Sequence, residues 1–369
     1  MNMPITLEHL AQVAGVSVST VSRALNDSDH AVNEDTRKRI LTLAQQMGYR
    51  PNLMARSLKT DRTFSIGIIV DNIVSPFTPI MIRGIQDYLK TFGYFSLVIN
   101  ADWNPETETE AIHDLISRSI DGIIFVESWL REPNPTLDVA NKPYVFVHRL
   151  FGTAERNAVS VDDFYGGRVA TEHLIQLKHR RIAYISGPSG WGASENRLWG
   201  YRAALNHAEI PIQPEYMYEG DWEVQGGYAA VKNFLTLPEP PTAIFAANDL
   251  MALGAIYALQ ESGRRVPEDV AVVGYDDREI ASIARPSITT VSLPCYEMGT
   301  MSAKLLLRLL RNKTLAAREK ETQSEKPIKI KGKLIMRESS GAPEGKIPLE
   351  RYQTHTTPRR LARLKKSAP

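Results

Sequence analysis

The sequence predicts a small all-α head, a hinge helix, and a larger α/β body with two lobes. In the first sixty residues, apolar side chains recur at the three- and four-residue spacing of helices on both sides of a tight turn. From residue 63 onward, apolar runs of strand length alternate with amphipathic stretches of helix length. The alternation restarts after residue 161, which predicts two lobes, each with a parallel sheet covered by helices on both faces. A chain of 369 residues is long enough for this head and body.

A helix-turn-helix is predicted close to the N-terminus. Gly15 supplies the positive φ that a tight turn between helices needs, and the Ser17 hydroxyl can cap the following helix. In that second helix, Val21, Ala24 and Leu25 share one buried stripe. The opposite side carries short or polar side chains, which suit a helix in the major groove of DNA. These residues are Val18, Ser19, Ser22 and Arg23.

A third helix is predicted at 34–47, with Asn33 as its N-cap and Gly48 just past its end. Its core face carries Ile40, Leu43, Ala44 and Met47. The first sixty residues contain seven Lys and Arg against five Asp and Glu, a net charge of +2. Because this charge attracts phosphates only modestly, a three-helix bundle with no role on DNA is the alternative at this point.

A short hinge helix is predicted to begin after Asn52, its N-cap, and to end near Leu58. A helix of this length is unstable by itself, so it would form only when a partner helix and DNA hold it. The Leu58 side chain can then act as an apolar wedge in the minor groove, with Arg56 or Lys59 beside it. A plain linker is the alternative for this segment.

Residues 10–26 read LAQVAGVSVSTVSRALN, and residues 48–58 read GYRPNLMARSL. Both runs resemble the motifs of the lactose-repressor (LacI/GalR) family of bacterial transcription regulators. The resemblance implies a dimer on a palindromic operator, with paired hinge helices that open a central base step. It also implies that Val18 and Ser19 set the operator preference and that Leu58 is the hinge leucine. The candidate DNA-contacting residues are Thr6, Ser17, Val18, Ser19, Thr20, Ser22, Arg23, Asn26, Asn52, Ala55, Arg56, Leu58 and Lys59.

The alternating pattern of the body places its strands and helices in order. Strands are predicted at 65–70, 95–99, 122–126, 144–148, 182–185, 217–219, 243–246 and 270–274. Helices are predicted at 78–92, 106–117, 166–178, 195–208, 224–235 and 250–263. Residues 313–327 are strongly charged and predict a solvated loop between two final strands.

Polar and aromatic residues follow several predicted strands, where open parallel sheets bind their ligands. Carboxylates, amides and one arginine among aromatic rings suit a sugar, because the polar groups bond its hydroxyls and the rings cover its C–H face. Each residue also has a plainer reading: Asp249 as a helix cap, Asp71 and Asp277 as turn residues, Trp191 as surface packing. Paired carboxylates can also hydrolyse glycosides, but no other feature of the sequence favours hydrolysis.

Three segments of the body carry a further resemblance to the same family. They are ANDLMALG at 247–254, VPEDVAVVGYDD at 266–277 and PSITTV at 286–291. The resemblance implies that the body is the family's effector domain, which is similar to periplasmic sugar-binding proteins. The expected fold is therefore a two-lobed, parallel-sheet domain with an effector in the cleft between the lobes.

The resemblance also assigns effector contacts position by position. It implies that Arg197, Asn248 and Asp276 bind the effector and that Trp222 stacks on a sugar ring, as an aromatic residue does in some members. Trp191 stands where purine-responsive members would have an arginine, which disfavours a purine corepressor. The candidate effector-binding residues are Ser75, Phe77, Ser128, Asp163, Phe164, Trp191, Arg197, Trp222, Asn248 and Asp276.

Several protein classes are disfavoured by what the sequence lacks. No apolar run approaches the ~20 residues of a membrane span, and no charged-then-apolar secretory leader opens the chain. The single cysteine, Cys295, cannot form a disulfide within the chain and suits a reducing compartment. No nucleophile elbow, P-loop, Rossmann fingerprint or His/Cys metal cluster is present, so we expect no catalysis, no cofactor and no metal. We expect a cytoplasmic bacterial protein that lies on the nucleoid when it is bound to DNA.

The predicted organisation is a helix-turn-helix domain at 1–50, a hinge helix and linker at 51–62, a two-lobed effector-binding and dimerisation domain at 63–340, and a basic tail at 341–369. The tail has a net charge of +5, lacks the leucine heptads of a tetramerising coiled coil, and is predicted to be disordered. An added non-specific contact of this tail with DNA is the alternative. The predicted function is repression of a carbohydrate-use operon under the control of a sugar-like effector. The alternatives are a corepressor-dependent regulator that answers to a non-sugar metabolite, and a sugar-binding module without gene control.

Overall fold

The computed structural model describes residues 5–25, 32–49, 62–127, 139–148, 157–316 and 327–341, with side chains up to residue 311 in the last long helix. The chain forms two compact units. One unit is Met1–Ser65 with Arg118–Asp121, and the other is Ile66–Ser117 with Gly122–Pro369. The predicted hinge helix and basic tail lie outside the described residues.

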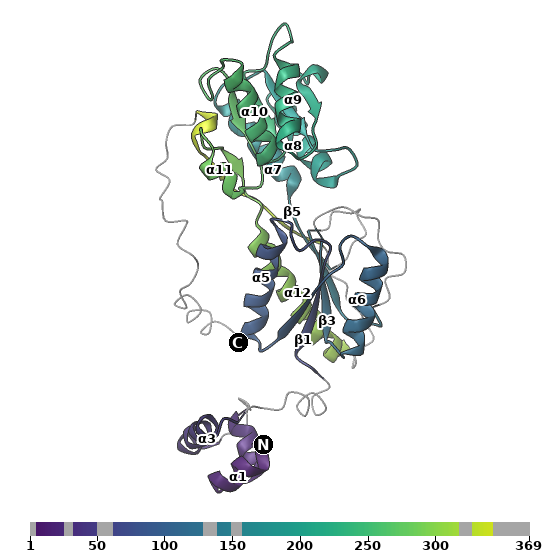
Figure 1. Cartoon of the computed structure of the whole chain (residues 1–369), viewed down its shortest axis with the longest axis vertical. Helices are drawn as coiled ribbons and strands as arrows, with labels where there is room; N and C mark the ends of the chain where they lie inside the picture. Colours follow the sequence, from purple (N-terminus) through teal and green to yellow (C-terminus); the bar gives the residue numbers. More distant parts are fainter. Residues whose placement is uncertain are drawn as a thin grey trace. The chain divides into compact units, whose positions relative to one another are not determined.

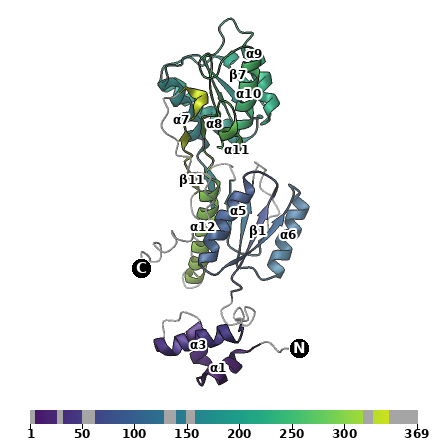
Figure 2. The same cartoon turned by 60° about the vertical axis from the view of Figure 1, so that its left-hand side comes forward.

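Three helices form the head: α1 (Leu7–Ala14), α2 (Val18–Leu25) and α3 (Glu34–Gln46). Leu10, Val21 and Ile40 bring one fully buried side chain from each helix into its core. Figure 2 shows α1 and α3 in contact within this bundle. The burial pattern confirms the predicted core, because the apolar stripes of the three helices can be covered only by one another.

The local signals at the ends of these helices are confirmed. Gly15 has φ 63° in the turn between α1 and α2, and the Ser17 hydroxyl accepts a bond from the Thr20 backbone N–H at 3.1 Å. The Asn33 side chain caps α3 by accepting from the Asp35 backbone N–H at 2.9 Å. Each interaction satisfies a backbone donor that the first turn of a helix leaves without a partner.

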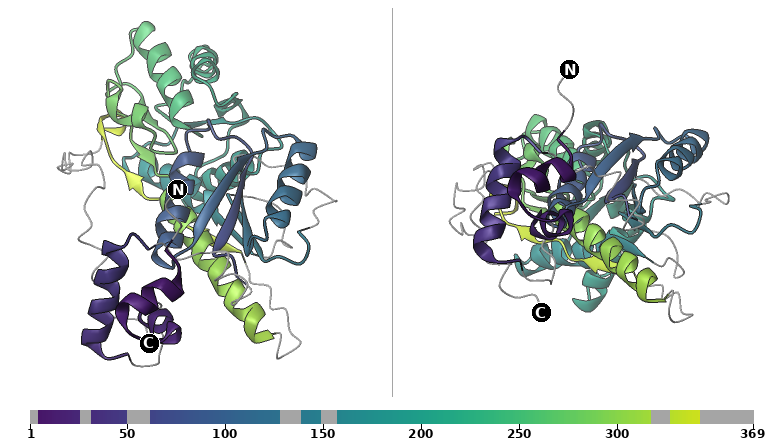
Figure 3. Two further views of the ribbon diagram at one scale, coloured as in Figure 1. Left: turned by 60° about the horizontal axis from the view of Figure 1, so that its bottom comes forward. Right: turned by 90° about the horizontal axis from the view of Figure 1, so that it is seen from below.

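Lobe 1 of the body is built on a six-stranded parallel sheet, in the order β11-β5-β4-β3-β1-β2. Its strands are β1 (Ser65–Val70), β2 (Phe95–Asn100), β3 (Gly122–Val126), β4 (Tyr144–Val147), β5 (Ala158–Val161) and β11 (Ile328–Ile330). Helices α5 (Thr78–Thr91) and α12 (Cys295–Ala316) lie side by side on one face of the sheet, and α6 (Pro105–Ser117) covers the other (Figures 1 and 3). Buried strand residues such as Ile68, Ile124 and Val147 form the core between these layers.

Lobe 2 has a four-stranded parallel sheet in the order β7-β6-β8-β9. Its strands are β6 (Ile182–Ser186), β7 (Met217–Glu219), β8 (Ala243–Ala246) and β9 (Ala271–Val273). Its helices are α7 (Asp163–Gln176), α8 (Gly192–His207), α9 (Val224–Phe234), α10 (Asp249–Glu261) and α11 (Glu279–Ile283). The lobe is completed by the antiparallel pair β10 (Thr290–Val291) and β12 (Leu334–Ile335) and by the 3₁₀ turns η1 (Pro214–Tyr216) and η2 (Glu338–Ser340).

The described chain crosses between the lobes after β5, after β10 and after β11. The crossing segments are bonded to one another: Asp162 N–H donates to Ile330 O at 2.9 Å, and Ser292 N–H donates to Lys333 O at 2.8 Å. Since the predicted alternation of strands and helices is observed on both sides of these crossings, the two-lobed parallel-sheet fold is confirmed.

Two expectations about the elements are corrected by the structure. Residues 313–316 continue α12, so the charged segment 313–327 begins in a helix and does not connect two strands. Helix α7 begins at Asp163, three residues before its predicted start, because the Asp162 carboxylate caps it at the Tyr165 N–H. Among the described residues, no helix has the length and apolarity needed to cross a membrane.

Candidate functional site

Arg197 lies at the centre of a buried polar cluster in lobe 2. Its side chain projects from α8 and is 4% exposed. Its Nε donates to Asp163 Oδ1 at 2.8 Å, and its Nη1 lies 3.3 Å from Asp276 Oδ1 and also donates to the Ala247 carbonyl oxygen. The guanidinium stacks on the Tyr275 ring at 3.6 Å from its centroid. The structure therefore brings together three residues that the sequence singled out separately.

The protonation states of this cluster follow from burial and from charge. Burial raises the pKa of Asp276 to about 6, although the Arg197 charge opposes the shift. Burial alone would lower the pKa of Arg197, but Asp163 and Asp276 raise it above its usual value. Arg197 is thus cationic at all ordinary pH values, whereas the Asp276 carboxylate takes up a proton in mildly acidic solution.

Asn248, a predicted effector contact, has a structural role in lobe 2. Its Oδ1 caps α10 by accepting from the Met251 N–H at 2.8 Å, and its Nδ2 donates to the Trp222 carbonyl oxygen at 2.7 Å. The reading of Asp249 as the cap is wrong. The Asp249 carboxylate is fully buried and accepts from Thr290 Oγ1 at 2.6 Å and from the Arg278 backbone N–H at 2.8 Å.

Trp222 and Trp191 form an aromatic wall beside the arginine. Their ring centroids are 5.8 Å apart at an interplanar angle of 62°, and Arg197 Cζ lies 5.7 Å from the Trp222 ring. Trp222 has φ 69°, and a Cβ at Gly187 would lie 2.1 Å from its ring. The ring can take this place only because residue 187 is a glycine. The buried Trp222 Nε1 has no hydrogen-bond partner, so it is a donor that a ligand could satisfy.

His148, which the sequence analysis did not select, lies at the carboxyl end of β4 with φ 65°. Its Nδ1 is 3.2 Å from the carbonyl oxygen of Glu127. A carbonyl only accepts, so Nδ1 carries the proton and the neutral ring presents an unprotonated Nε2. Burial lowers the pKa of His148, Asp163 raises it and Arg197 lowers it, which places the ring near the lobe 2 cluster. The buried Nε2 has no partner and is a ready acceptor.

A signal for His148 was present in the sequence. It is a polar residue directly after a buried apolar strand, as Asp71 and Asp276 are. The predicted strand at 144–148 includes His148 as its last residue, which hid this signal. Tyr275, the ring under Arg197, follows the predicted strand at 270–274 and was not among the candidate effector-binding residues.

The remaining predicted effector residues are more scattered. Phe77 is half-buried at the start of α5, and the Ser75 hydroxyl accepts from its N–H at 3.4 Å. Phe164 follows Asp163 in the first turn of α7 and is 40% exposed. Ser128 lies outside the described residues. Among the described residues, no hydrogen bond or ring contact joins Ser75, Phe77 or Phe164 to Arg197.

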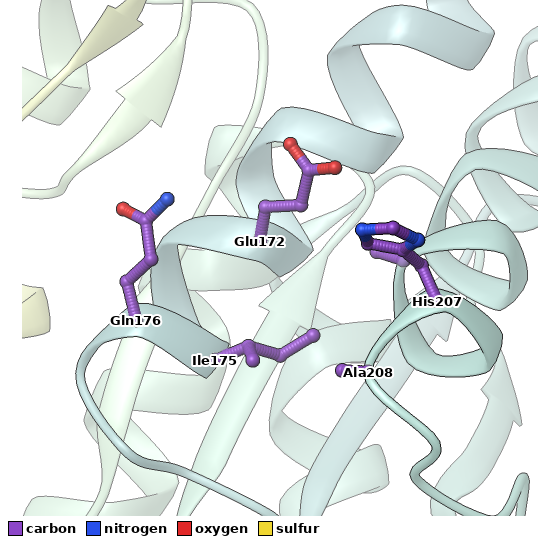
Figure 4. Close-up of a pocket in the computed structure, with 6 residues that line it drawn as sticks. Glu172, Ile175, Gln176, His207 and Ala208 are labelled. Carbon is purple, nitrogen blue, oxygen red and sulfur yellow. The ribbon is translucent and has the colours of Figure 1, made fainter.

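A surface hollow of about 330 Å³ lies between the carboxyl-terminal halves of α7 and α8 (Figure 4). It is lined by Glu172, Ile175, Gln176, Ala204, His207 and Ala208. Glu172 is paired with Arg168 on the same helix at 3.5 Å. None of the cluster around Arg197 takes part in this hollow, and we assign it no function.

The second helix of the head presents a mixed polar surface. The Val18 side chain is 41% exposed, and Ser19 and Arg23 are exposed beside it. The hydroxyls of Ser17 and Ser19 lie 2.8 Å apart, and Ser17 also lies 2.8 Å from the Thr20 hydroxyl. The first turn of α2 therefore carries a small hydroxyl network next to one apolar side chain.

The other predicted DNA-contacting residues divide into two groups. The Thr6 hydroxyl caps α1 by accepting from the His9 N–H at 3.2 Å, and Ser22 is half-buried on α2. The rest lie outside the described residues: Asn26, Asn52, Ala55, Arg56, Leu58 and Lys59.

In the described ranges, no group of three or more His, Cys, Asp or Glu side chains could hold a metal ion. Cys295 is buried, and burial raises the pKa of its thiol.

Arg39 on α3 was also not selected from the sequence. Its Nη2 donates to the Ala14 carbonyl oxygen at 2.9 Å, at the carboxyl end of α1. A cation at this position satisfies a carbonyl that the helix leaves open and interacts favourably with the helix dipole. The charge of Arg39 therefore stabilises the head. Less of the positive charge of the head is then available to contact DNA phosphates.

Family models match both parts of the chain. Residues 6–52 match bacterial regulatory proteins of the lacI family, and residues 171–340 match a periplasmic binding protein-like domain. The chain is similar to the HTH-type transcriptional regulator RegA of Clostridium saccharobutylicum, at 38% identity over 85% of this chain and 95% of that protein. It is also similar to catabolite control protein A of Priestia megaterium, at 32% identity over 85% and 95%.

Solved structures agree with these relatives. The lac repressor dimer bound to operator and the anti-inducer ONPF matches with a TM-score of 0.72 at 29% identity, over 92% of this chain and 99% of that one. A complex of the regulator CelR with cellobiose matches with a TM-score of 0.65 at 34% identity, over 91% and 100%. The helix-turn-helix head, the two-lobed body and the similarity to these relatives agree with one another. The chain belongs to the lacI family of bacterial regulatory proteins and is a DNA-binding transcription regulator.

Proposed function

We propose that this regulator represses a carbohydrate-use operon and that a sugar or sugar derivative, held at the Arg197 cluster, controls its binding to a palindromic operator. The observation that carries this proposal is the pairing of a buried guanidinium, held by Asp163 and Asp276, with the Trp222 ring. Charged groups that bond vicinal hydroxyls, next to a ring that covers C–H groups, are what sugar sites need.

Each group has a distinct part in this binding. Asp276 accepts from ligand hydroxyls, Arg197 donates to ring or hydroxyl oxygens, and the Trp222 Nε1 donates where it has no partner in the protein. His148 Nε2 adds an acceptor from lobe 1. A ligand bonded both to His148 and to the lobe 2 cluster would favour one arrangement of the lobes over the others.

The relatives support a carbohydrate effector. One similar structure is a complex with cellobiose, and one relative at 32% identity over 84% of this chain is the ribose operon repressor of Escherichia coli. We extend from them the dimer, the cytoplasmic location and the association with the nucleoid when the protein is bound to DNA. We also propose the organisation stated above: head at 1–50, hinge and linker at 51–62, body at 63–340, tail at 341–369.

On the operator, two α2 helices of the dimer would lie in successive major grooves, with Val18 and Ser19 at the base edges. The hinge helices, with Leu58, would wedge the minor groove between them. The hinge helices would fold only when lobe 1 of one protomer and lobe 1 of its partner lie at one distance from each other. Effector affinity and operator affinity are therefore coupled, typically by ~1–3 kcal/mol in allosteric proteins.

A titration tests the proposed function directly. A labelled operator, selected from random palindromes with the purified chain, is titrated at fixed salt with sugars and sugar phosphates that include ribose and cellobiose. We expect fluorescence anisotropy to show operator binding that one compound weakens. A compound that strengthens binding would indicate a corepressor instead. Binding that no compound changes would contradict the carbohydrate site, and binding to no palindrome would contradict the role of the head.

The pH dependence of effector binding is a second prediction. Asp276 has a raised pKa of about 6, so its carboxylate is present above that pH and is lost as pH falls through it. Burial lowers the pKa of His148 from its ordinary value, so this ring is neutral at pH 7.5. We expect effector affinity to fall about tenfold between about pH 7.5 and pH 5, as measured by calorimetry. The Asp276→Asn variant should bind weakly at both pH values. A wild-type affinity that stays constant would remove Asp276 from the site.

A further inference from the structure

We infer that Asp121 is a positioning residue for operator recognition, because its carboxylate fixes the course of the chain where the DNA-binding segment joins the body. This inference rests on the proposed function as an operator-binding dimer. Arg118–Asp121 belong to the same compact unit as Met1–Ser65, although they lie more than fifty residues further along the chain. No motif in the sequence selects Asp121, and it is neither in the effector cluster nor in the head.

Asp121 is 8% exposed, and its carboxylate accepts bonds from two consecutive residues. Its Oδ1 accepts from the Thr63 backbone N–H at 3.0 Å, and its Oδ2 accepts from the Phe64 backbone N–H at 2.9 Å. The Thr63 hydroxyl lies 3.2 Å from the same Oδ1 and 2.9 Å from the Ser119 carbonyl oxygen, so its one proton serves these two acceptors. Both carboxylate oxygens are therefore used to hold residues 63 and 64.

The conformation held in this way is not one that the chain would adopt by default. Phe64 has φ 53°, in the left-handed region that residues with a side chain rarely occupy. Directly after it, Ser65 begins β1, and Asp121 N–H donates to the Ser65 carbonyl oxygen at 2.8 Å. The turn at Phe64 thus lies between the segment that leads to the DNA and the first strand of the body. The Asp121 carboxylate stabilises this turn by accepting from the backbone N–H groups of Thr63 and Phe64.

The consequence concerns the freedom of the chain at this junction. If the carboxylate is lost, residues 63 and 64 can sample other backbone angles, and operator binding has to order them again. In a dimer on a palindrome, two such junctions set the distance between the heads. Loosening them should weaken binding to the preferred operator and should also reduce discrimination against operators with another half-site spacing.

The test uses the full chain and two labelled duplexes. One duplex is the palindrome recovered by selection with the wild-type chain, and the other has one base pair added at its centre. In Asp121→Asn an NH₂ group that cannot accept replaces one oxygen, so one of the two backbone N–H groups loses its partner. We expect the affinity for the first duplex to fall roughly tenfold and the ratio of the two affinities to fall several-fold.

Asp114→Asn is the matched control. Asp114 is exposed on α6, in the same part of the chain, and this substitution removes the same charge. It should leave both affinities unchanged. The inference is overturned if Asp121→Asn lowers both affinities by the same factor, which a loss of folded protein would do, or if it changes neither. Failure of the proposed function would be seen earlier, because the wild-type chain would then select no palindrome.

Discussion

Replacing Arg197 by methionine is expected to lower the free energy of unfolding of the body by about 3–5 kcal/mol, because it leaves two buried carboxylates without their cation. The side chains of Asp163 and Asp276 are 0% and 7% exposed, so water cannot replace the guanidinium. Urea unfolding followed by circular dichroism measures this loss. The same variant should no longer respond to the effector, because the central donor of the site is gone.

The loss of stability should depend on pH. The pKa of Asp276, already raised by burial, would rise further without Arg197. In the variant, the loss of unfolding free energy caused by the unpaired Asp276 carboxylate is full above the raised pKa of the folded state. This loss disappears as pH falls towards the ordinary pKa of aspartate. Arg168→Met is the control, because Arg168 is 43% exposed and its pairing with Glu172 is a surface ion pair of little value. Equal stability of Arg197→Met and wild type at neutral pH would show that the buried pairing does not stabilise the fold.

The second large effect is expected from Gly187→Ala. A Cβ at this position would lie 2.1 Å from the Trp222 ring, so the ring must move. Overpacking of this kind typically costs about 1–3 kcal/mol, which corresponds to about tenfold or more in affinity when the displaced group contacts the ligand. We expect calorimetry to show this loss for the sugar identified in the operator titration, and the intrinsic tryptophan fluorescence to change with it.

A double-mutant cycle identifies the route of the effect. If Gly187→Ala acts by moving the Trp222 ring, it should have little further effect in a Trp222→Leu background. Ser189→Ala is the control in the same loop, because the bond of Ser189 to Glu219 Oε1 is made by its backbone N–H. Additive losses in the cycle would mean that Gly187 acts on the site through another contact.

Much of the fold could be predicted from the sequence because its signals are local. Gly15, Ser17 and Asn33 act within one turn of the chain, and all three were placed correctly. The sequence was less informative where an element depends on distant partners. Strand β5 has four residues and is buried by β4 and β11, and α12 continues to Ala316 along lobe 1. Neither β5 nor the end of α12 shows an apolar periodicity in the sequence that would distinguish it from the neighbouring residues.

The site shows the same division. Arg197 and Asp276 could be selected as polar residues in expected positions, but their shared contact depends on the packing of α8 against the end of the sheet. His148 was missed, since only the structure shows that its Nδ1 is engaged and its Nε2 buried without a partner. Asn248 was selected for a ligand, and its role as the cap of α10 became visible only from its two bonds.

The two hydrogen bonds of the Asn248 amide restrict which substitutions the proposed effector site can accept. Its amide holds the start of α10 and the backbone of Trp222, so a substitution that retunes ligand contact there also damages the fold. Arg197 is restricted in the same way by its two carboxylates. Phe164, another candidate for the proposed site, makes no side-chain hydrogen bond and is 40% exposed at the first turn of α7. New ligand preferences in descendants of this protein should therefore arise first at Phe164, while the polar centre stays as it is.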